Sequence, residues 1–269
     1  MPEIHLPKIH VTVWDGPENA ARAVFVHGST TWGPSAFARQ RPLATEHRLE
    51  LVDRRGYGRS PDVEHSDAVL DAQDLLDVLG GGPAHLVGHS FGTVGALLAA
   101  GRAVDAVRSL TLIEPSCYRA VADDPVVGAA LERNRAAIAA FGDRPLPSAE
   151  DYLRLSTESV GMPPLEPTPE RLRAAGTAMR ERPCWDVEVP MEEVAAAPWP
   201  KLVINGSWED APAAYREAGG VPLMACGRAT ATRIGAELLV VPGSAHEPHW
   251  DQAEIVNDAL RRTWARAGG

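Results

Sequence analysis

The stretch "AHLVGHSFGTVGALLAA", residues 84–100, joins two patterns that belong to different secondary structures. Residues 84–88 are an apolar run typical of a buried strand, and residues 91–100 are small and apolar, as in a closely packed helix. Between them, Gly88-His89-Ser90-Phe91-Gly92 matches the pattern G-x-S-x-G. In this motif a serine occupies a sharp turn between strand and helix, and its hydroxyl projects from the edge of the sheet. The motif therefore predicts that Ser90 is a nucleophile.

Short runs of strand type alternate with alanine-rich helical stretches along most of the chain. The runs are HVTVW, AVFVHG, RLELVDRRG, AHLVGHS, VRSLTLIEP, KLVINGS and AELLVVPGSAH. Continuous apolar strands separated by helices are typical of a mostly parallel sheet that is covered on both faces. We therefore expect a doubly wound α/β fold.

This alternation stops between residues 116 and 199, where helical periodicity continues without a strand run and prolines divide the segment into short helices. Open α/β sheets bind their ligands at the carboxyl edge of the strands. We expect residues 1–115 and 200–269 to form the α/β core. Residues 116–199 are expected to form a helical cap over that edge.

Composition restricts the classes of partner. The chain has 269 residues, is 45% hydrophobic and carries a formal net charge of −10, which argues against nucleic acid or an anionic membrane as the main partner. The first residues show no basic segment followed by an apolar one, and no apolar run is long enough to span a membrane. We expect a cytoplasmic protein that acts on a small molecule.

Metal and cofactor motifs are absent from the sequence. The three cysteines, Cys117, Cys184 and Cys226, are scattered without CxxC spacing and are expected to be small buried side chains. The chain contains neither a glycine-rich phosphate loop nor an HExxH motif. We therefore expect no cofactor and no metal.

Two other turns would complete the chemistry of a serine nucleophile. In AVFVHGST, Gly28 follows a strand and lets the next main-chain N–H turn inward, so that the amides of Ser29 and Phe91 would form a donor pair for an oxyanion. In LLVVPGSAHEPHW, a late strand delivers His246, the base that a serine hydroxyl needs. His249 is expected to begin the next helix and to cap it or face solvent.

The chain resembles the α/β-hydrolase superfamily over nearly its whole length. The segments that carry the resemblance are HGST, DRRGYGRS, GHSFG, LTLIEP, KLVINGS and GSAHEP, in the order and spacing of that family. The resemblance implies that Ser90 is the nucleophile, His246 the base, Ser29 and Phe91 the oxyanion donors, and residues 116–199 the cap. DRRGYGRS resembles a structural loop of the family, to which we assign no chemistry.

Three carboxylates compete for the acidic position of a triad. Many relatives place an aspartate three residues after the glycine that ends strand seven, but GSWED puts Glu209 at that step and Asp210 after it. Glu114 ends the strand LTLIEP, and the chain is similar here to haloalkane dehalogenases and fungal mycotoxin lactonases. We predict Glu114, because Pro115 favours an extended backbone before it and because a carboxylate at a buried strand end needs a partner.

These features predict a cofactor-free serine hydrolase that cleaves a carboxylic ester or lactone through an acyl-enzyme. Apolar residues of the cap, with Trp32 after the oxyanion turn and Trp185 in the cap, indicate an apolar or aromatic substrate. The alternatives are a thioesterase or ring-closing acyltransferase of secondary metabolism, a cofactor-free lyase or oxygenase, and a binding protein built on a hydrolase fold.

Overall fold

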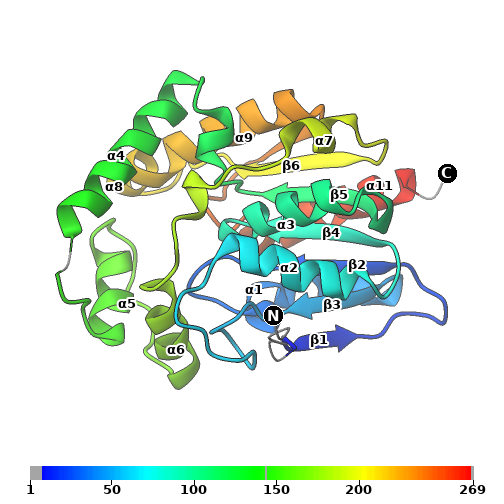
Figure 1. Ribbon diagram of the computed structural model, residues 1–269, viewed down its shortest axis with the longest axis horizontal. Coiled ribbons are helices and arrows are strands. Elements are labelled where there is room, and N and C mark those ends of the chain that lie inside the picture. The colour runs from blue at the N-terminus through cyan, green and yellow to red at the C-terminus, as the bar shows by residue number, and fades with distance from the viewer. Residues whose placement is uncertain (1–7, 143, 268–269) are drawn as a thin grey trace, which may run out of the picture.

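The computed structural model describes residues 8–142 and 144–267, and within them seven strands form one sheet in the order β1-β3-β2-β4-β5-β6-β7 (Figure 1). Every neighbouring pair is parallel except β1 and β3. The predicted doubly wound, mostly parallel α/β fold is confirmed. The strands are β1 (Val11–Trp14), β2 (Arg22–Val26), β3 (Arg48–Val52), β4 (Ala84–His89), β5 (Val107–Ile113), β6 (Lys201–Gly206) and β7 (Glu237–Val241).

Helices cover both faces of the sheet. One face packs against α2, α3, α7 and α9, and the other against η1 and α11. The helical elements are α1 (Gly33–Ala36), η1 (Ala38–Thr45), α2 (Ala68–Leu79), α3 (Phe91–Arg102), η2 (Val104–Ala106), η3 (Tyr118–Val121), α4 (Pro125–Phe141), α5 (Ala149–Glu158), α6 (Pro169–Ala178), η4 (Cys184–Asp186), α7 (Met191–Ala196), α8 (Ala213–Tyr215), the π-helix η5 (Arg216–Gly220), α9 (Val221–Ile234), α10 (Pro248–Asp251) and α11 (Ala253–Arg266).

The strands supply side chains to two cores because successive residues of a strand point to opposite faces. In β2, Val24 and Val26 are buried in the core under α2 and α3, whereas Ala23 and Phe25 are buried in the core under α11. This explains why the central strands read as continuous apolar runs.

The glycines of the serine motif allow α3 to lie directly against the sheet. A Cβ at Gly88 would lie 2.8 Å from the carbonyl oxygen of Gly92, and a Cβ at Gly92 would lie 2.6 Å from the carbonyl oxygen of Val26. Carbon and oxygen atoms do not approach so closely without displacing the backbone. A larger residue at Gly88 would therefore push α3 away from β4, and one at Gly92 would push it away from β2.

Residues 116–199 carry helices and, among the described ones, no strand. In Figure 1, α4, α5 and α6 lie to the left of the sheet, beyond the ends of the parallel strands, while α7 returns to pack on α3 and α9. The three longest helices begin at side-chain caps, because Asp124, Ser148 and Thr168 each accept a hydrogen bond from a main-chain N–H of the first turn.

The loop DRRGYGRS anchors α6. Arg173 donates to the carbonyl oxygens of Gly58 and Ser60, and the hydroxyl of Thr177 donates to Gly56 O at 2.7 Å. Gly56 has a φ of 81°, and a Cβ there would lie 2.6 Å from the Thr177 methyl group. The segment to which sequence reasoning assigned no chemistry thus fixes the position of α6.

Among the helices that the structure describes, none combines the length and the apolar character needed to cross a membrane.

Candidate active site

Ser90 occupies a strained turn between β4 and α3. Its backbone has φ 50° and ψ −122°, and its N–H donates to Ile113 O on β5 at 2.9 Å. Positive φ is costly for a residue with a Cβ, and such residues cluster at functional sites. Of the five non-glycine residues with positive φ in the described chain, four surround this turn: Thr30, Ser90, Glu114 and Trp208.

His246 lies within hydrogen-bonding distance of the serine. It follows β7, and its Nε2 is 2.9 Å from Ser90 Oγ. The imidazole of His89 fixes the main chain here, because its Nε2–H donates to His246 O at 2.9 Å. The structure therefore brings together Ser90 and His246, the two residues predicted from distant segments to be a nucleophile and its base.

The Glu114 carboxylate faces the other nitrogen of His246. Glu114 Oε2 lies 3.8 Å from His246 Nδ1, longer than a hydrogen bond, and neither atom has another hydrogen-bond partner. Glu114 Oε1 accepts from the N–H of Gly206 at 2.6 Å and from Nε1 of Trp208 at 3.3 Å. The carboxylate is fully buried, and these donors hold it directly behind the imidazole.

The backbone of Glu114 differs from the sequence prediction. An extended conformation was expected because proline follows, but φ is 51°. The N–H of Glu114 donates to Ile204 O at 2.8 Å, which continues the pairing of β5 with β6. The expectation is wrong because this bond and the two donors to the side chain outweigh the local preference imposed by Pro115.

The electrostatics at His246 favour its protonated form. Burial lowers the pKa of His246, but the Glu114 carboxylate, with a smaller contribution from Glu247, raises it to a net value above the usual one. An imidazole of raised pKa is a stronger base once it is neutral.

The two rival carboxylates lie elsewhere. Glu209 is exposed, and its Oε1 accepts from the N–H of Gly243 at 3.1 Å in the turn after β7. Asp210 is exposed as well. The segment GSWED instead contributes Trp208, whose indole donates to Glu114.

The two proposed oxyanion donors flank the serine. Phe91 is the first residue of α3, where a helix leaves its N–H without an intrahelical partner. Gly28 precedes Ser29, and a Cβ at Gly28 would lie 2.9 Å from Ser90 Cβ. The absence of a side chain at Gly28 therefore lets the turn that carries Ser29 approach the nucleophile.

Ser90 and His246 open into a cavity of about 340 Å³, a size that suits a small molecule. Trp185 lines it, as predicted. Trp32 is not among its lining residues, because Trp32 lies at the start of α1 as its N-cap. The wall consists of Ser29, Ser90, Phe91, Ser116, Tyr118, Ile138, Ala178, Glu181, Arg182, Pro183, Cys184, Trp185, Leu223 and His246.

Sequence reasoning missed the polar residues of this wall. The Ser116 hydroxyl donates to Ser90 O at 3.2 Å and lies 3.5 Å from Cys184 Sγ. Glu181 accepts hydrogen bonds from Ser29 and Tyr57. These residues belong to no motif, and only the folding of the cap onto the core brings them to the serine. All three cysteines are buried and free, as expected.

The prediction for His249 is wrong. It lies in α10 but is completely buried, with its ring centroid 5.3 Å from that of Phe37 and 4.4 Å from that of His89. The apolar side chain of Phe37 thus covers it, and burial lowers the pKa of His249 to about 3.

His89, Glu247 and His249 form the one cluster of three metal-ligating side chains found in the described chain, with ligand atoms up to 4.8 Å apart. His89 already uses Nε2 to bind His246 O, so Nδ1 is the ring nitrogen that it has left for this cluster.

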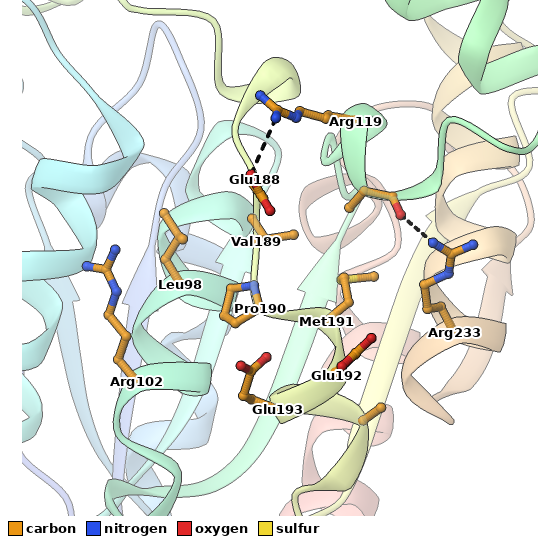
Figure 2. Close-up of a pocket in the computed structure, with 12 residues that line it drawn as sticks. Leu98, Arg102, Arg119, Glu188, Val189, Pro190, Met191, Glu192, Glu193 and Arg233 are labelled. Carbon is orange, nitrogen blue, oxygen red and sulfur yellow. Dashed lines mark hydrogen bonds and ion pairs between the residues drawn. The ribbon is translucent and has the colours of Figure 1, made fainter.

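A larger hollow of about 880 Å³ lies between η3, α7, α9 and the end of α3 (Figure 2). Its wall mixes three arginines with three glutamates, and Arg119 pairs with Glu188 at its rim. None of Ser90, His246 and Glu114 lines it.

Residues 23–259 match the sequence model of the alpha/beta hydrolase family. Among curated proteins, Lipase LipV of Mycobacterium tuberculosis is 35% identical over 106 residues, which are 38% of this chain and 40% of the lipase. The sn-1-specific diacylglycerol lipase ABHD11 of Mus musculus is 34% identical over 107 residues, 38% of this chain and 35% of that protein. These matches span less than half of either relative.

Solved structures match over almost the whole chain. A thermophilic esterase from Thermogutta terrifontis has a TM-score of 0.62 and 25% identity, covering 96% of this chain and 93% of the esterase. The enol-lactonase from Burkholderia xenovorans LB400 has a TM-score of 0.59 and 21% identity, covering 96% of each chain. At 21% identity, the likeness to the enol-lactonase shows a shared fold and nothing more.

Proposed function

Because the chain belongs to the alpha/beta hydrolase family, we propose that it is a serine hydrolase that cleaves a carboxylic ester or lactone of a small molecule through an acyl-enzyme. The observation that carries this proposal is the 2.9 Å approach of His246 Nε2 to Ser90 Oγ on a strained strand-to-helix turn. The chain also resembles an esterase and two lipases, which supports an ester as the bond that is cleaved.

In the first half-reaction, Ser90 Oγ attacks the carbonyl carbon of the substrate while its proton passes to His246 Nε2. The carbonyl oxygen becomes an oxyanion that the amides of Ser29 and Phe91 stabilise. Glu114 orients the imidazole and stabilises its positive charge. The bond to the leaving oxygen then breaks, and that oxygen takes the proton from His246.

In the second half-reaction, a water molecule gives one proton to His246 Nε2 and attacks the acyl carbon. The ester bond to Ser90 Oγ breaks, and Oγ recovers its proton from the imidazole. The acid product leaves and the site returns to its starting state. All these steps use side chains and amides of this chain.

We also propose that residues 116–199 act as a cap on the core formed by residues 1–115 and 200–269. The cap segment supplies Ser116, Tyr118, Ile138 and residues 181–185 to the wall of the cavity. Substrate specificity would then depend mainly on the cap.

A fluorophosphonate tests the nucleophile directly, because it forms a stable adduct with an activated serine. We expect one adduct per chain by intact-mass spectrometry, mapped to Ser90 by peptide analysis, and complete loss of ester turnover. Ser90→Ala should lose the adduct while remaining folded.

Ser116→Ala is the matched control, since Ser116 lines the same cavity. This variant should still form the adduct. If Ser90→Ala still forms the fluorophosphonate adduct and keeps its ester turnover, Ser90 is not the nucleophile. Phenyl acetate, a small lactone and an acyl thioester, compared on the wild type, distinguish an esterase from a lactonase and a thioesterase.

A further inference from the structure

One carboxylate in the cavity wall takes no part in the proposed proton transfers. Glu181 Oε1 accepts from the hydroxyl of Tyr57 at 2.7 Å and lies 2.9 Å from Nη2 of Arg54. Its Oε2 accepts from the hydroxyl of Ser29. The side chain is only 9% exposed, and it lines the same cavity as Ser90. Since a carboxylate oxygen accepts up to two hydrogen bonds, Oε2 retains the capacity to accept another.

The charges around Glu181 are unbalanced. Arg54 is buried between two carboxylates, with its Nε 2.7 Å from Asp71 Oδ2 and its Nη2 beside Glu181. Burial raises the pKa of Asp71 to about 6, so that it is ionised at neutral pH. The cluster then carries one more negative than positive charge.

The one arginine of the cavity wall does not neutralise this excess. Arg182 pairs with Asp67 at 3.0 Å, and its side chain is 65% exposed, so solvent screens its charge. The cluster of Arg54, Asp71 and Glu181 therefore keeps its excess negative charge at the cavity wall.

Aromatic rings line the same space. Trp185 and Tyr118 both belong to the wall, on the cap side of the serine. The faces of such rings attract cations, and the attraction strengthens where water is excluded. A carboxylate that offers only acceptors, placed in one small cavity with aromatic rings, is the chemistry that binds an ammonium group.

We propose that the substrate is an ester or lactone that carries a positively charged ammonium group, which binds between Glu181 and the aromatic rings of Trp185 and Tyr118. This inference rests on the proposed hydrolase function for the reaction that follows binding. It assigns to Glu181 the selection of cationic over neutral substrates and the rejection of anionic ones.

Three phenyl esters with chains of similar length and differing charge test the selection. They carry 4-(trimethylammonio)butanoyl, 5,5-dimethylhexanoyl and glutaryl groups, which are cationic, neutral and anionic. Each kcat/KM is divided by the rate constant of hydroxide hydrolysis of the same ester. We expect the cation to exceed the neutral ester by about tenfold or more, and the anion to fall below it by a similar factor.

A second series carries the cationic and neutral groups on the alcohol side of acetate esters. A preference for the cation in either series supports the inference, because the ammonium group can belong to either product. Equal corrected values for cation and neutral ester in both series overturn it.

Variants locate the selection at Glu181. Glu181→Gln should reduce the preference for the cation to about twofold or less and leave hydrolysis of the neutral ester measurable. Arg182→Gln removes the opposite charge and should increase the preference. Glu188→Gln removes an exposed carboxylate of the other hollow (Figure 2) and should leave the ratio unchanged. An unchanged ratio in folded Glu181→Gln overturns the assignment.

Binding tests the inference without turnover. Calorimetry on Ser90→Ala compares (2-hydroxyethyl)trimethylammonium with 3,3-dimethylbutan-1-ol, which has the same shape and no charge. Tighter binding of the cation, weakened about tenfold in Trp185→Leu, supports the inference even if Glu181→Gln does not fold. Equal binding overturns it. If neutral esters are hydrolysed without charge preference, the inference fails alone, whereas absence of any ester turnover contradicts the proposed function.

Discussion

Glu114 holds its carboxylate against His246 in a backbone conformation that proline would not favour. A positive φ costs a non-glycine residue about 1–3 kcal/mol, and the structure must supply that free energy elsewhere. It does so through the bonds from Gly206 and Trp208, which also fix the direction of the carboxylate. Sequence reasoning selected the residue but could not foresee this conformation, because β6 and the loop after it, about 90 residues further along the chain, supply the bonds.

Replacing Glu114 by Gln should lower kcat by roughly 10² to 10⁴, because the imidazole loses the charge that stabilises its protonated form. Glu209→Gln and Asp210→Asn should each cost less than about tenfold, since both side chains are exposed and Glu209 binds Gly243 instead. Steady-state kinetics on variants shown to be folded by circular dichroism decide the ranking. A larger loss in Glu209→Gln than in Glu114→Gln would move the acid to the turn after β6.

The pH profile reports the state of His246. The base must be neutral to accept the serine proton, and its pKa is raised above the ordinary value of about 6.5. The kcat/KM should therefore fall as the pH drops through a midpoint above 6.5. In Glu114→Gln, where the group that raises the pKa is gone, the midpoint of the residual activity should move to lower pH. A flat profile down to pH 5 in folded protein would contradict the role of His246.

At the scale of elements, the cap contains aromatic residues of two kinds. Trp185, in η4, lines the cavity. Trp199 precedes β6, is 7% exposed, and donates from its indole to Val104 O at 3.1 Å. Both belong to residues 116–199, whose apolar side chains were expected from the sequence to face the substrate. Only Trp185 lines the cavity, because Trp199 lies where the chain rejoins the core.

We therefore expect a change at Trp185 to alter substrate preference and a change at Trp199 to alter stability. Trp185→Ala should alter the relative kcat/KM values of a series of acyl esters by about tenfold with little change in stability, since a lining residue makes contacts specific to each substrate. Trp199→Phe should lower the free energy of unfolding by about 1 kcal/mol through its lost hydrogen bond and leave the relative rates unchanged. Ester panels and urea unfolding of both variants check this, and a uniform loss of rate in Trp185→Ala would make that residue structural.

The elements of the core could be predicted because their signals are local. All seven strands were recognised from apolar runs, and the turn at Ser90 from its two glycines. The cap could be predicted only as a group of helices. Contacts such as those of Arg173 with the loop DRRGYGRS, and of Glu181 with Ser29, join segments more than 100 residues apart, and neither Arg173 nor Glu181 belongs to a local pattern.

At the scale of the whole molecule, buried histidines connect stability to pH. Burial lowers the pKa values of His85, His89 and His249 to about 3, and it lowers the pKa of His27 well below the ordinary value. The unfolded chain binds protons at these residues below about pH 6.5 while the folded chain does not, so the free energy of unfolding falls as the pH drops. Each contributes about 1.4 kcal/mol per pH unit. Asp71 opposes this trend. Its pKa is raised to about 6 in the folded chain, which therefore binds a proton there below that pH while the unfolded chain does not.

The free energy of unfolding should therefore fall by about 4 kcal/mol between pH 6 and pH 5, a large part of the stability of an ordinary domain. Urea titrations monitored by circular dichroism at pH 7.5, 6.5, 6 and 5 measure the slope. His85→Gln should reduce it by about 1.4 kcal/mol per pH unit. A free energy that is constant from pH 7 to pH 5 would show that these histidines are not buried in the neutral form.

The burial of all three cysteines has a practical consequence for observing the cap. Alkylating reagents react with accessible thiolates, whereas Cys117 and Cys226 are fully buried and Cys184, which borders the cavity, is only 5% exposed. Burial also raises the pKa of Cys184 to about 12. A new cysteine on the exposed side of α5 would be the one readily reactive thiol among the residues of the described structure. A fluorophore attached there would show whether α5 moves relative to the core during turnover, without removal of any native cysteine.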